Sequence, residues 1–353
     1  MEYGCTLELH SPPRAGVRQE LRAFLDRSGL GGAPGVRHTA LVRDGAGRII
    51  AAASLEENVV KCVAVDPDHR GEGLTAAVLT PLRRLALEEG RRRLFLYTKP
   101  DRRTQFAPLG FHEVARTEEV VLMEDRRGGF AAWAASVRPA DCAGPVGAVV
   151  MNANPMTLGH LYLVEQAAAQ CARLCLLVVS EDRSAVPAAD RRALAEAAVG
   201  HLPNVSVAGT EDYLISSATF PDYFLKDRRR GGAVWTALDA AVFCRLAETA
   251  GISVRFVGSE PFCPVTRAYN EALAQALPAR GVALRELPRL ERDGRAVSAT
   301  AVRALVQAGR WEEIRPLVPE TTYSWFAGPE NRAVFLERAA ALDRHEHGEE
   351  LRI

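Results

Sequence analysis

Residues 147–168, GAVVMNANPMTLGHLYLVEQAA, indicate the fold of the C-terminal part of the chain. A short apolar run ends at Asn152-Ala-Asn-Pro155, and helical spacing of apolar residues resumes after Thr157-Leu-Gly-His160. This order predicts a buried strand, a polar turn and a helix, as in the first crossover of a parallel sheet. The N-terminus of such a helix presents unpaired N–H groups and a positive dipole end, which attract phosphate.

Polar side chains gather around this strand-to-helix turn. Thr157 and His160 are three residues apart, so a hydroxyl and an imidazole face the same side of the helix. Gly159 permits close backbone approach, and the amides of Asn152 and Asn154 lie in the turn. A histidine at a helix start is often only a cap, but the strand, the turn and the helix together predict a phosphate site.

The rest of this region alternates between apolar strands and helical segments. Strand candidates are GAVVM, LCLLVVS, VSVAG and VRFVG, and helix candidates cover 159–171, 188–201, 235–250 and 267–277. The alternation predicts an α/β domain with a parallel sheet and helices on both faces. The charged segment 331–353 predicts a separate C-terminal helix.

The N-terminal region has an α+β pattern instead. Residues 38–67 are typical of strand, turn, strand and strand, with DGAG at 44–47 as the hairpin signal. A glycine-rich turn, HRGEGL at 69–74, leads into an apolar-periodic helix over 75–90. We therefore expect a smaller α+β domain in front of the α/β domain.

Length and composition agree with two domains of a globular protein. A chain of 353 residues suffices for two cores, and the Gly-, Ala- and Pro-rich segment 126–145 separates the two patterns. We place the boundary near residue 140, which gives domains at 1–140 and 141–330 and a terminal helix at 331–353.

The charge and cysteine content exclude several classes of protein. Lys and Arg total 44 and Asp and Glu total 44, so no overall field draws the chain to nucleic acid or to a membrane. No apolar run approaches the roughly 20 residues of a membrane helix, and the N-terminus lacks the pattern of a signal peptide. Seven scattered cysteines without a CxxC pair predict reduced thiols and a cytoplasmic protein, and we assign no direct metal ligands.

The glycine-rich turn of the N-terminal region resembles that of the GNAT N-acetyltransferase fold. In VAVDPDHRGEGLTAAVL the matching positions are Arg70, Gly73 and Thr75, and Leu109-Gly-Phe111 resembles a later element of that fold. The resemblance implies backbone amides that bind the pyrophosphate of coenzyme A, with Arg70 and Gly73 among the binding residues.

Two departures leave the activity of this N-terminal domain open. Thr75 replaces a small residue, and its side chain would crowd a closely approaching phosphate. No obvious general base can be picked from the preceding strands. Two functions therefore remain open for this domain. It docks a partner that bears a CoA-like group, or it carries out acetyl-CoA chemistry.

The C-terminal region resembles the nucleotidyltransferase superfamily. Thr157-Leu-Gly-His160 is similar to its (H/T)xGH motif, and VSATAVRALV is similar to its later Ser/Thr-rich helix start with an arginine. Members of the superfamily direct attack at the α-phosphate of ATP and expel pyrophosphate. The resemblance implies that Ser298 and Thr300 bind phosphate, with Arg303 one turn into the helix.

Several stretches in a fixed order narrow the resemblance to the citrate lyase ligase family. They are NANPMTLGHLYLVEQAA, VVSEDRSAVPAADR, SSATFPDYFLKD, VGSEPFCPVTRAYNEAL and VSATAVRALV, preceded by the acetyltransferase-like domain. The family resemblance implies an acid–thiol ligase that uses ATP with Mg²⁺. Acetate and the thiol of the citrate lyase acyl carrier subunit, on its CoA-like prosthetic group, would give acetylated carrier, AMP and pyrophosphate through acetyl adenylate.

This reaction implies roles for the residues of both motifs. His160 and the nearby amides would stabilise charge on the α- and β-phosphates with help from Thr157, while Ser298, Thr300 and Arg303 would hold pyrophosphate. A carboxylate needs little activation, so catalysis would rest on positioning and on charge stabilisation.

Three further residues are candidates by position. Lys226, one of only three lysines in the chain, would neutralise phosphate or fix acetate, or else simply begin the basic surface run KDRRR. Gly258 and Glu260 follow a later strand, where ligands of open parallel sheets bind, and both are cofactor-binding candidates. Glu260 would contact adenosine or else a loop of the protein.

Other functions remain open at this point. An adenylyltransferase acting on pantetheine phosphate or nicotinamide mononucleotide would share both phosphate motifs. It would not need the front domain, and its phosphate acceptor would require extra cations, of which the sequence has few near Thr157. A non-catalytic module that senses a CoA-like arm should have lost the phosphate-binding residues. A protein acetyltransferase is the remaining alternative.

Overall fold

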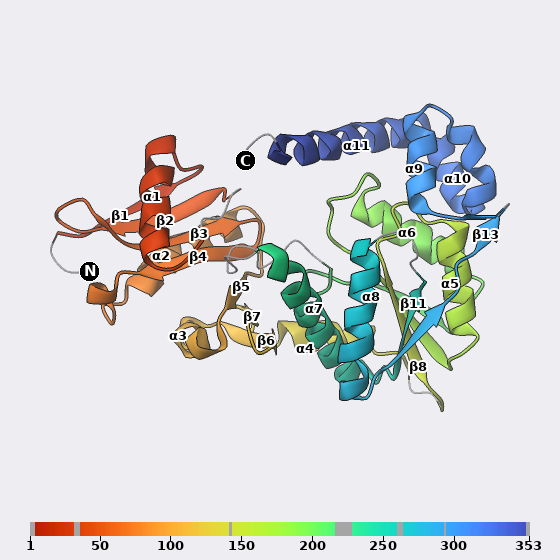
Figure 1. The fold of residues 1–353 in the computed structure, drawn as a ribbon, viewed down its shortest axis with the longest axis horizontal. Helices are drawn as coiled ribbons and strands as arrows, with labels where there is room; N and C mark the ends of the chain where they lie inside the picture. Colours follow the sequence, from red (N-terminus) through yellow and green to blue (C-terminus); the bar gives the residue numbers. More distant parts are fainter. Residues whose placement is uncertain are drawn as a thin grey trace. The chain divides into compact units, whose positions relative to one another are not determined.

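The computed structural model describes residues 4–31, 36–140, 143–215, 228–259, 264–292 and 294–350. The chain divides into two compact units (Figure 1). The N-terminal unit comprises Met1–Phe130 with Ala218–Val242, and the C-terminal unit comprises Ala131–Ser217 with Phe243–Ile353. The domain limits at residues 140 and 330 stay predictions.

A seven-stranded sheet forms the centre of the N-terminal unit, in the order β1-β2-β3-β4-β5-β7-β6. Only β4 and β5 run parallel, and the other neighbours pair antiparallel. This mixed sheet confirms the predicted α+β domain. The strands are β1 (Thr6–His10), β2 (His38–Arg43), β3 (Ile49–Glu56), β4 (Val59–Val65), β5 (Phe95–Thr98), β6 (His112–Arg116) and β7 (Val121–Glu124).

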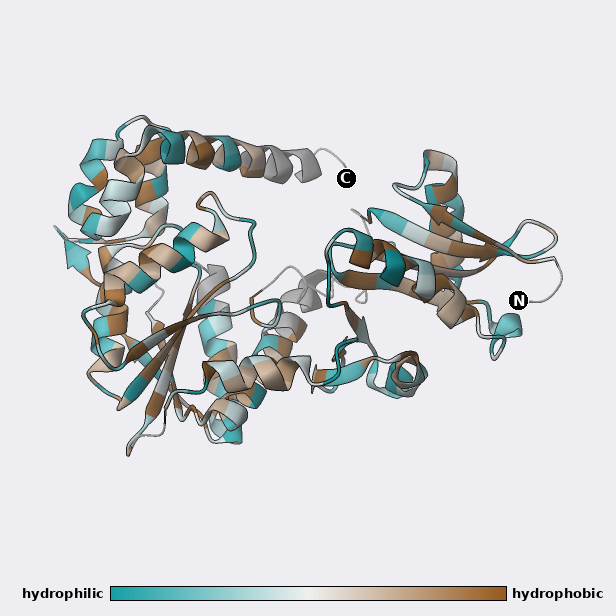
Figure 2. Cartoon of the chain, turned by 180° about the vertical axis from the view of Figure 1, so that it is seen from behind, coloured by the Kyte–Doolittle hydropathy of each residue, from teal (hydrophilic) through white to brown (hydrophobic). Residues whose placement is uncertain are grey.

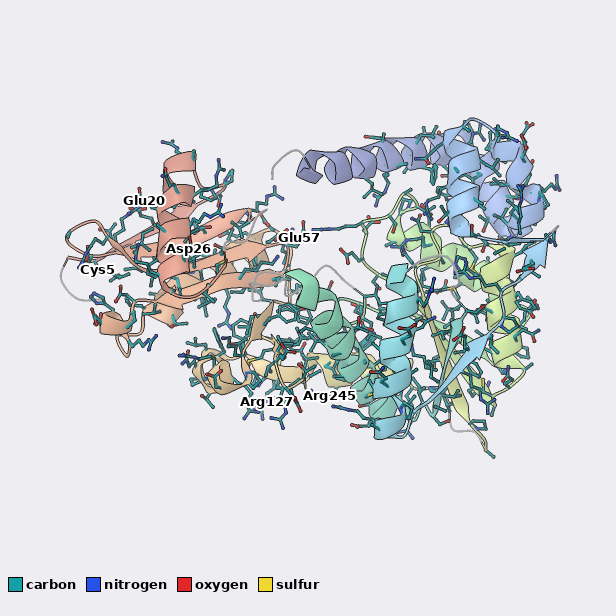
Figure 3. All side chains as sticks on the ribbon, viewed as in Figure 1. Cys5, Glu20, Asp26, Glu57, Arg127 and Arg245 are labelled. Atoms are coloured by element: carbon teal, nitrogen blue, oxygen red, sulfur yellow. The ribbon has the colours of Figure 1, made fainter. Side chains whose placement is uncertain are left out.

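Helices cover both faces of this sheet. α1 (Ala15–Arg27) packs Leu21, Phe24 and Leu25 on one face, while its Glu20 and Asp26 are exposed (Figure 3). α2 (Leu74–Glu88) packs on the opposite face. The central strand β3 is therefore buried on both sides, which explains its near-continuous apolar sequence, IIAAASLE. The short helix α3 (Arg103–Phe106) also belongs to this unit, whereas α4 (Gly129–Val137) lies mostly in the C-terminal unit.

Strands β4 and β5 pair over only a short distance. The register has the parallel pairs Val59–Phe95 and Val60–Leu96. The pairing of β4 with β3 shifts between Ala52 and Ser54, and Cys62 on β4 adopts a left-handed φ of 55°. Such a bulge turns the strand away from its neighbour, so β4 and β5 diverge toward their carboxyl ends.

The C-terminal unit contains a five-stranded sheet in the order β10-β9-β8-β11-β12, parallel throughout. Figure 2 shows apolar residues concentrated along its strands. The first strand, β8, lies in the middle, so the strand order reverses between β8 and β11. The strands are β8 (Val146–Met151), β9 (Arg173–Val178), β10 (Val205–Gly209), β11 (Val254–Gly258) and β12 (Ala283–Leu287).

The side chains of β11 show that helices cover both faces of this sheet, as predicted. Phe256 belongs to the core shared with α5, α6 and α9, whereas Arg255 contacts Phe243 of α7 and Tyr269 of α8. A hairpin of β13 (Glu291–Arg292) and β14 (Arg295–Ala296) precedes α9. The helices are α5 (Leu158–Ala168), α6 (Ala188–Val199), α7 (Arg228–Ala250), α8 (Pro264–Ala276), α9 (Ala299–Gln307), α10 (Glu320–Ala327) and α11 (Pro329–Glu350).

Candidate active site

The predicted phosphate site lies where β8 passes into α5, beside the point at which the strand order reverses. Ligands of open parallel sheets bind at this position, because the carboxyl ends of the strands leave a crevice there. Thr157 caps α5: its Oγ1 accepts a hydrogen bond from the His160 N–H at 3.2 Å. The Thr157 N–H in turn donates to Nδ1 of His160 at 3.2 Å, so the two residues hold each other in place.

His160 is an uncharged hydrogen-bond donor at neutral pH. Burial lowers the pKa of its imidazole from 6.5 to about 4, and the positive charges of Arg289 and Arg303 act in the same direction. Because Nδ1 accepts a bond from the Thr157 N–H, the neutral ring carries its proton on Nε2. The site thus offers one N–H donor from His160, and its positive charge comes from arginines.

Gly159 is required by a contact within the protein. A Cβ built at this position would lie 2.6 Å from the carbonyl oxygen of Val297. Any larger side chain would push the start of α5 away from the segment that leads into α9. The close approach expected at this glycine is therefore made by the backbone of the second motif.

The second motif meets the first at the start of α9. Ser298 caps this helix, with its Oγ accepting from the Ala301 N–H at 3.2 Å. Arg303 donates to the carbonyl oxygen of Asn154 at 2.8 Å and to Oγ1 of Thr300 at 3.1 Å. Burial lowers the pKa of Arg303, although its guanidinium stays charged at neutral pH. Two helix N-termini and their predicted residues thus lie together.

The two turn asparagines bind a neighbouring loop of the protein. Asn152 donates to Oγ of Ser184 at 3.2 Å, and Oδ1 of Asn154 accepts from the Val186 N–H at 3.0 Å. Both contacts connect the turn after β8 to the loop after β9. Their predicted contact with nucleotide stays a prediction.

A buried arginine that the sequence analysis missed organises the same loops. Arg191 of α6 is fully buried and donates to the carbonyl oxygens of Asn152 at 2.9 Å and Val179 at 2.7 Å. It falls on the apolar face of α6, in register with Leu194 and Ala198, and this position was the available signal. Such bonds satisfy carbonyl groups that the ends of β8 and β9 leave unpaired.

The C-terminal helix also supports the loop after β9. Arg338 of α11 donates to the carbonyl oxygen of Ser184 at 2.9 Å and to Oδ1 of Asp182 at 2.8 Å. Oδ1 of Asp182 also accepts from the Ala188 N–H at 2.8 Å, at the start of α6. A helix remote in sequence therefore helps to hold the wall of the site.

The other candidates of the C-terminal unit follow β11. Gly258 ends this strand, and its carbonyl oxygen accepts from Nδ2 of Asn270 at 3.2 Å. Lys226 and Glu260 lie outside the described residues. The sequence analysis did not single out Arg289. Its positive charge helps to lower the pKa of His160, so it also belongs to the surroundings of the site.

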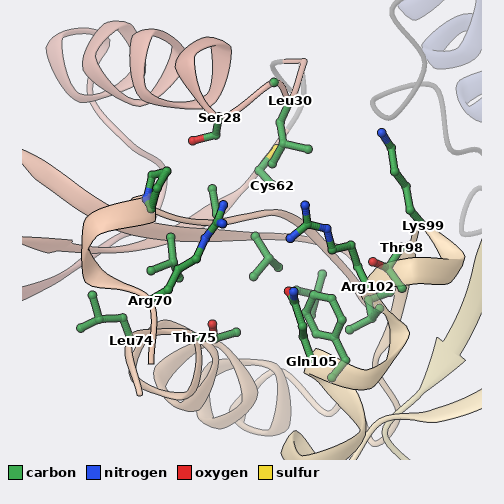
Figure 4. Close-up of a pocket in the computed structure, with 18 of the residues that line it drawn as sticks. Ser28, Leu30, Cys62, Arg70, Leu74, Thr75, Thr98, Lys99, Arg102 and Gln105 are labelled. Atoms are coloured by element: carbon green, nitrogen blue, oxygen red, sulfur yellow. The ribbon is translucent and has the colours of Figure 1, made fainter. Parts of the chain in front are cut away.

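A cavity of about 560 Å³ opens in the N-terminal unit between the diverging ends of β4 and β5. The glycine-rich turn forms one wall, with Gly73 in a left-handed φ of 75° at the start of α2. Figure 4 shows Arg70 and Arg102 reaching toward one another across this cavity. The charged residues of its lining are Arg27, Arg70, Lys99, Arg102 and Asp101, with His69 beside them, so the lining is basic in a chain of zero net charge.

No group of three or more His, Cys, Asp or Glu side chains placed to hold a metal occurs among the described residues. Within the same ranges, no helix combines the length and apolar character needed to cross a membrane. Five cysteines lie in the described part, and none of them forms a disulfide with another described cysteine: Cys5, Cys62, Cys171, Cys175 and Cys244.

A capped Thr-x-Gly-His helix start, joined to a Ser/Arg helix start at the reversal point of a parallel sheet, defines an α/β protein of the nucleotidyltransferase type. The family model "Citrate lyase ligase C-terminal domain" matches residues 146–326. The chain belongs to the citrate lyase ligase family.

Relatives of the same family extend over most of the chain. The chain is 41% identical to a [citrate [pro-3S]-lyase] ligase of Klebsiella pneumoniae, across 79% of this chain and 83% of that protein. It is 38% identical to the Escherichia coli K12 ligase of the same name, across 78% and 80% of the two chains.

Two solved structures have partial similarity to the chain. Escherichia coli ElaA matches 35% of this chain and 99% of its own, with 13% identity and a TM-score of 0.31. Thermotoga maritima TmcAL bound with alpha-thio ATP matches 51% of this chain and 54% of its own, with 18% identity and a TM-score of 0.34.

Replacing Gly159 should disturb the joint between the two helix starts. We expect Gly159→Ala to lower the free energy of unfolding by about 1–3 kcal/mol, because the added methyl overpacks against the Val297 carbonyl. Gly200→Ala is the matched control, since a Cβ there meets atoms no closer than 3.6 Å. Urea unfolding followed by circular dichroism measures the free energy of unfolding of both variants. Equal values for the two variants would contradict the contact between Gly159 and Val297.

The protonation state of His160 is directly measurable. We expect ¹⁵N NMR to show a neutral imidazole with its proton on Nε2 and a pKa of about 4, assigned by comparison with His160→Gln. The unfolded imidazole takes up its proton near pH 6.5 and the folded one near pH 4. The His160 contribution to stability is therefore complete above pH 6.5 and is lost as the pH falls through that window. A pKa near 6.5 in the folded protein would refute the assignment.

Proposed function

We propose that this protein activates citrate lyase by acetylating the thiol prosthetic group of its acyl carrier subunit, at the expense of ATP. Acetate would displace pyrophosphate from ATP to form acetyl adenylate, and the carrier thiol would then displace AMP. The observation that carries the proposal is the contact between the two phosphate motifs, seen in Arg303 and Asn154, in a member of this ligase family. A phosphate acceptor, as in the adenylyltransferases, is not favoured by the names of the relatives.

In the first step a carboxylate oxygen of acetate attacks the α-phosphorus. The bond from this phosphorus to the bridging oxygen breaks, and its electron pair leaves with pyrophosphate. The Nε2–H of His160 would donate to phosphate oxygens that gain charge, while Arg303 and the N–H groups at the start of α9 would hold the leaving group. A neutral donor in this position strengthens its bond as charge develops, without needing a proton transfer.

In the second step the carrier sulfur attacks the carbonyl carbon of acetyl adenylate. The thiol proton is released, the bond from this carbon to the AMP oxygen breaks, and the products are AMP and the acetyl thioester. AMP is a good leaving group, so the main task of the protein is to bring the sulfur into line and to exclude water.

Mg²⁺ would enter with ATP. Mg²⁺ that binds nucleotides is usually held by phosphate oxygens, water and one or two carboxylates. It would lower the negative charge that repels the attacking carboxylate. Lys226 stays a candidate for binding phosphate or acetate. Glu260 stays a candidate for the adenosine side of the site.

The cavity of the N-terminal unit would bind the CoA-like arm of the carrier. Its basic lining suits the phosphates of such a group, and the backbone at Gly73 with Arg70 would contact them. The diverging ends of β4 and β5 leave an opening for the pantetheine part. We also infer a cytoplasmic enzyme, because the described cysteines form no disulfide with one another.

The reaction itself is tested with purified protein, ATP, Mg²⁺ and acetate, with and without the reduced carrier. We expect acetate-dependent exchange of pyrophosphate into ATP without carrier, and AMP plus acetyl thioester with it. His160→Gln and Arg303→Gln should each lower the exchange rate about 100- to 1,000-fold, as for loss of a transition-state donor.

The control for this assay is His201→Gln, which alters a histidine with 56% of its side chain exposed at the far end of α6. It should leave the exchange rate unchanged. Release of pyrophosphate only in the presence of pantetheine phosphate or nicotinamide mononucleotide would replace the ligase by an adenylyltransferase.

The role of the N-terminal cavity calls for a separate measurement. We expect Arg70→Ala and Arg102→Ala to raise the KM for the carrier about tenfold and to leave acetate-dependent pyrophosphate exchange unchanged, because exchange does not involve the carrier. Arg84→Ala on the outer side of α2, with 83% of its side chain exposed, is the matched control. An unchanged carrier KM in both cavity variants would exclude this site.

A further inference from the structure

Arg338 lies on the face of α11 that packs against the C-terminal unit. Phe335 and Ala339 of the same helix are buried in the core shared with α5, α6 and α9. Arg338 is three residues after Phe335 and next to Ala339, so its side chain leaves the helix on this side. Only 29% of the side chain is exposed. The core contacts of α11 therefore fix the position from which Arg338 reaches the neighbouring loop.

The guanidinium of Arg338 binds the loop between β9 and α6 at three acceptors. Its Nε donates to the carbonyl oxygen of Ser184 at 2.9 Å, and its Nη2 donates to the carbonyl oxygen and Oδ1 of Asp182 at 2.7 and 2.8 Å. Asp182 Oδ1 also accepts from the Ala188 N–H at the start of α6. Because the donors of a guanidinium point in fixed directions, these bonds set the path of the loop backbone.

The same loop holds the turn that contains the first phosphate motif. Val186, two residues after Ser184, donates its N–H to Oδ1 of Asn154 at 3.0 Å. The carbonyl oxygen of Asn154 in turn accepts from Nη1 of Arg303 at 2.8 Å. Hydrogen bonds and short stretches of chain therefore connect Arg338 of α11 with Arg303 of α9.

The direction of the Arg303 guanidinium depends on this connection. Its hydrogen bonds to described residues go to the carbonyl oxygen of Asn154 and to Oγ1 of Thr300. Thr300 belongs to α9 itself, so the bond to Asn154 is the one that aligns Arg303 with the turn before α5. A small displacement of a charged group is costly in catalysis, because its effect depends on precise distance and direction.

We propose that Arg338 is a positioning residue for the formation of acetyl adenylate. By fixing the loop after β9 it holds Asn154, and through Asn154 it holds Arg303 in the direction that receives the departing pyrophosphate. The inference rests on the proposed function and deepens it, since it adds a residue of the terminal helix to the first step. In that step the bond from the α-phosphorus to the bridging oxygen breaks, and the charge that passes to pyrophosphate is the charge Arg303 stabilises.

The test measures acetate-dependent exchange of pyrophosphate into ATP by the full chain and by Arg338→Ala. We expect kcat to fall about tenfold, because Arg303 is displaced. The KM for ATP should change by less than about twofold, because the lost interaction strengthens only as pyrophosphate leaves. Arg338→Lys keeps one donor group for the same carbonyl oxygens and should recover part of the rate. Circular dichroism at the assay temperature gives the folded fraction, so that rates are compared per folded molecule.

A double-variant cycle shows whether Arg338 acts through Arg303. We expect Arg338→Ala to cause no further loss of exchange when it is added to Arg303→Gln, because the group that it positions is already absent. The control is Arg192→Ala on α6, which removes the same charge from a side chain that is 51% exposed and pairs with Glu196 of its own helix. Its exchange rate should equal that of the unaltered chain.

Other outcomes overturn the inference. Unchanged exchange per folded molecule in Arg338→Ala would leave Arg338 with a structural role only, and a raised KM with an unchanged kcat would make it a residue of substrate binding. Losses that multiply in the double variant would show that Arg338 acts independently of Arg303. If the unaltered chain shows no acetate-dependent exchange, the proposed function fails and this inference fails with it. Normal exchange in the unaltered chain and in Arg338→Ala would reject this inference alone.

Discussion

The contact between the starts of α5 and α9 is the constraint on which the active site depends. Gly159 allows the Val297 carbonyl to approach, and Arg303 closes the joint by donating to the Asn154 carbonyl at 2.8 Å. Two helix N-termini, each with unpaired N–H groups and a positive dipole end, are thereby brought to one place. Without this joint each would be an ordinary capped helix, and together they form the site that we propose binds phosphate.

The division of charge in this site follows from burial. Desolvation keeps His160 neutral, so it contributes a directed N–H rather than a cation, while arginines remain charged under the same conditions. Thr157 fixes the ring through Nδ1, which leaves Nε2–H as the donor. The arrangement suits the transfer to acetate that we propose, because a carboxylate needs no general base.

The loops around the site are supported by residues without a direct chemical role. Arg191 binds the carbonyl oxygens at the ends of β8 and β9, and Arg338 of the terminal helix binds the loop between β9 and α6. Buried guanidinium groups suit this task because their five donors can satisfy several carbonyls at once. Precise positioning of phosphate-binding groups depends on such support.

The sequence by itself determined the two patterns, the parallel sheet and the residues of both phosphate motifs, because strand and helix periodicity and helix capping are local properties. The predicted helix 188–201 differs from α6 by only two residues at its end, and 159–171 overlaps α5 closely. What only the tertiary structure decided is which distant residues meet. Arg289 and Arg338 look like surface arginines in an arginine-rich chain, and only the sheet order and helix packing bring them to this edge of the sheet. Arg191 lies on the apolar face of α6, but its carbonyl partners could be found only in the tertiary structure. The contact that requires a glycine at position 159 could not be predicted either, since the Val297 carbonyl lies 138 residues away in the sequence.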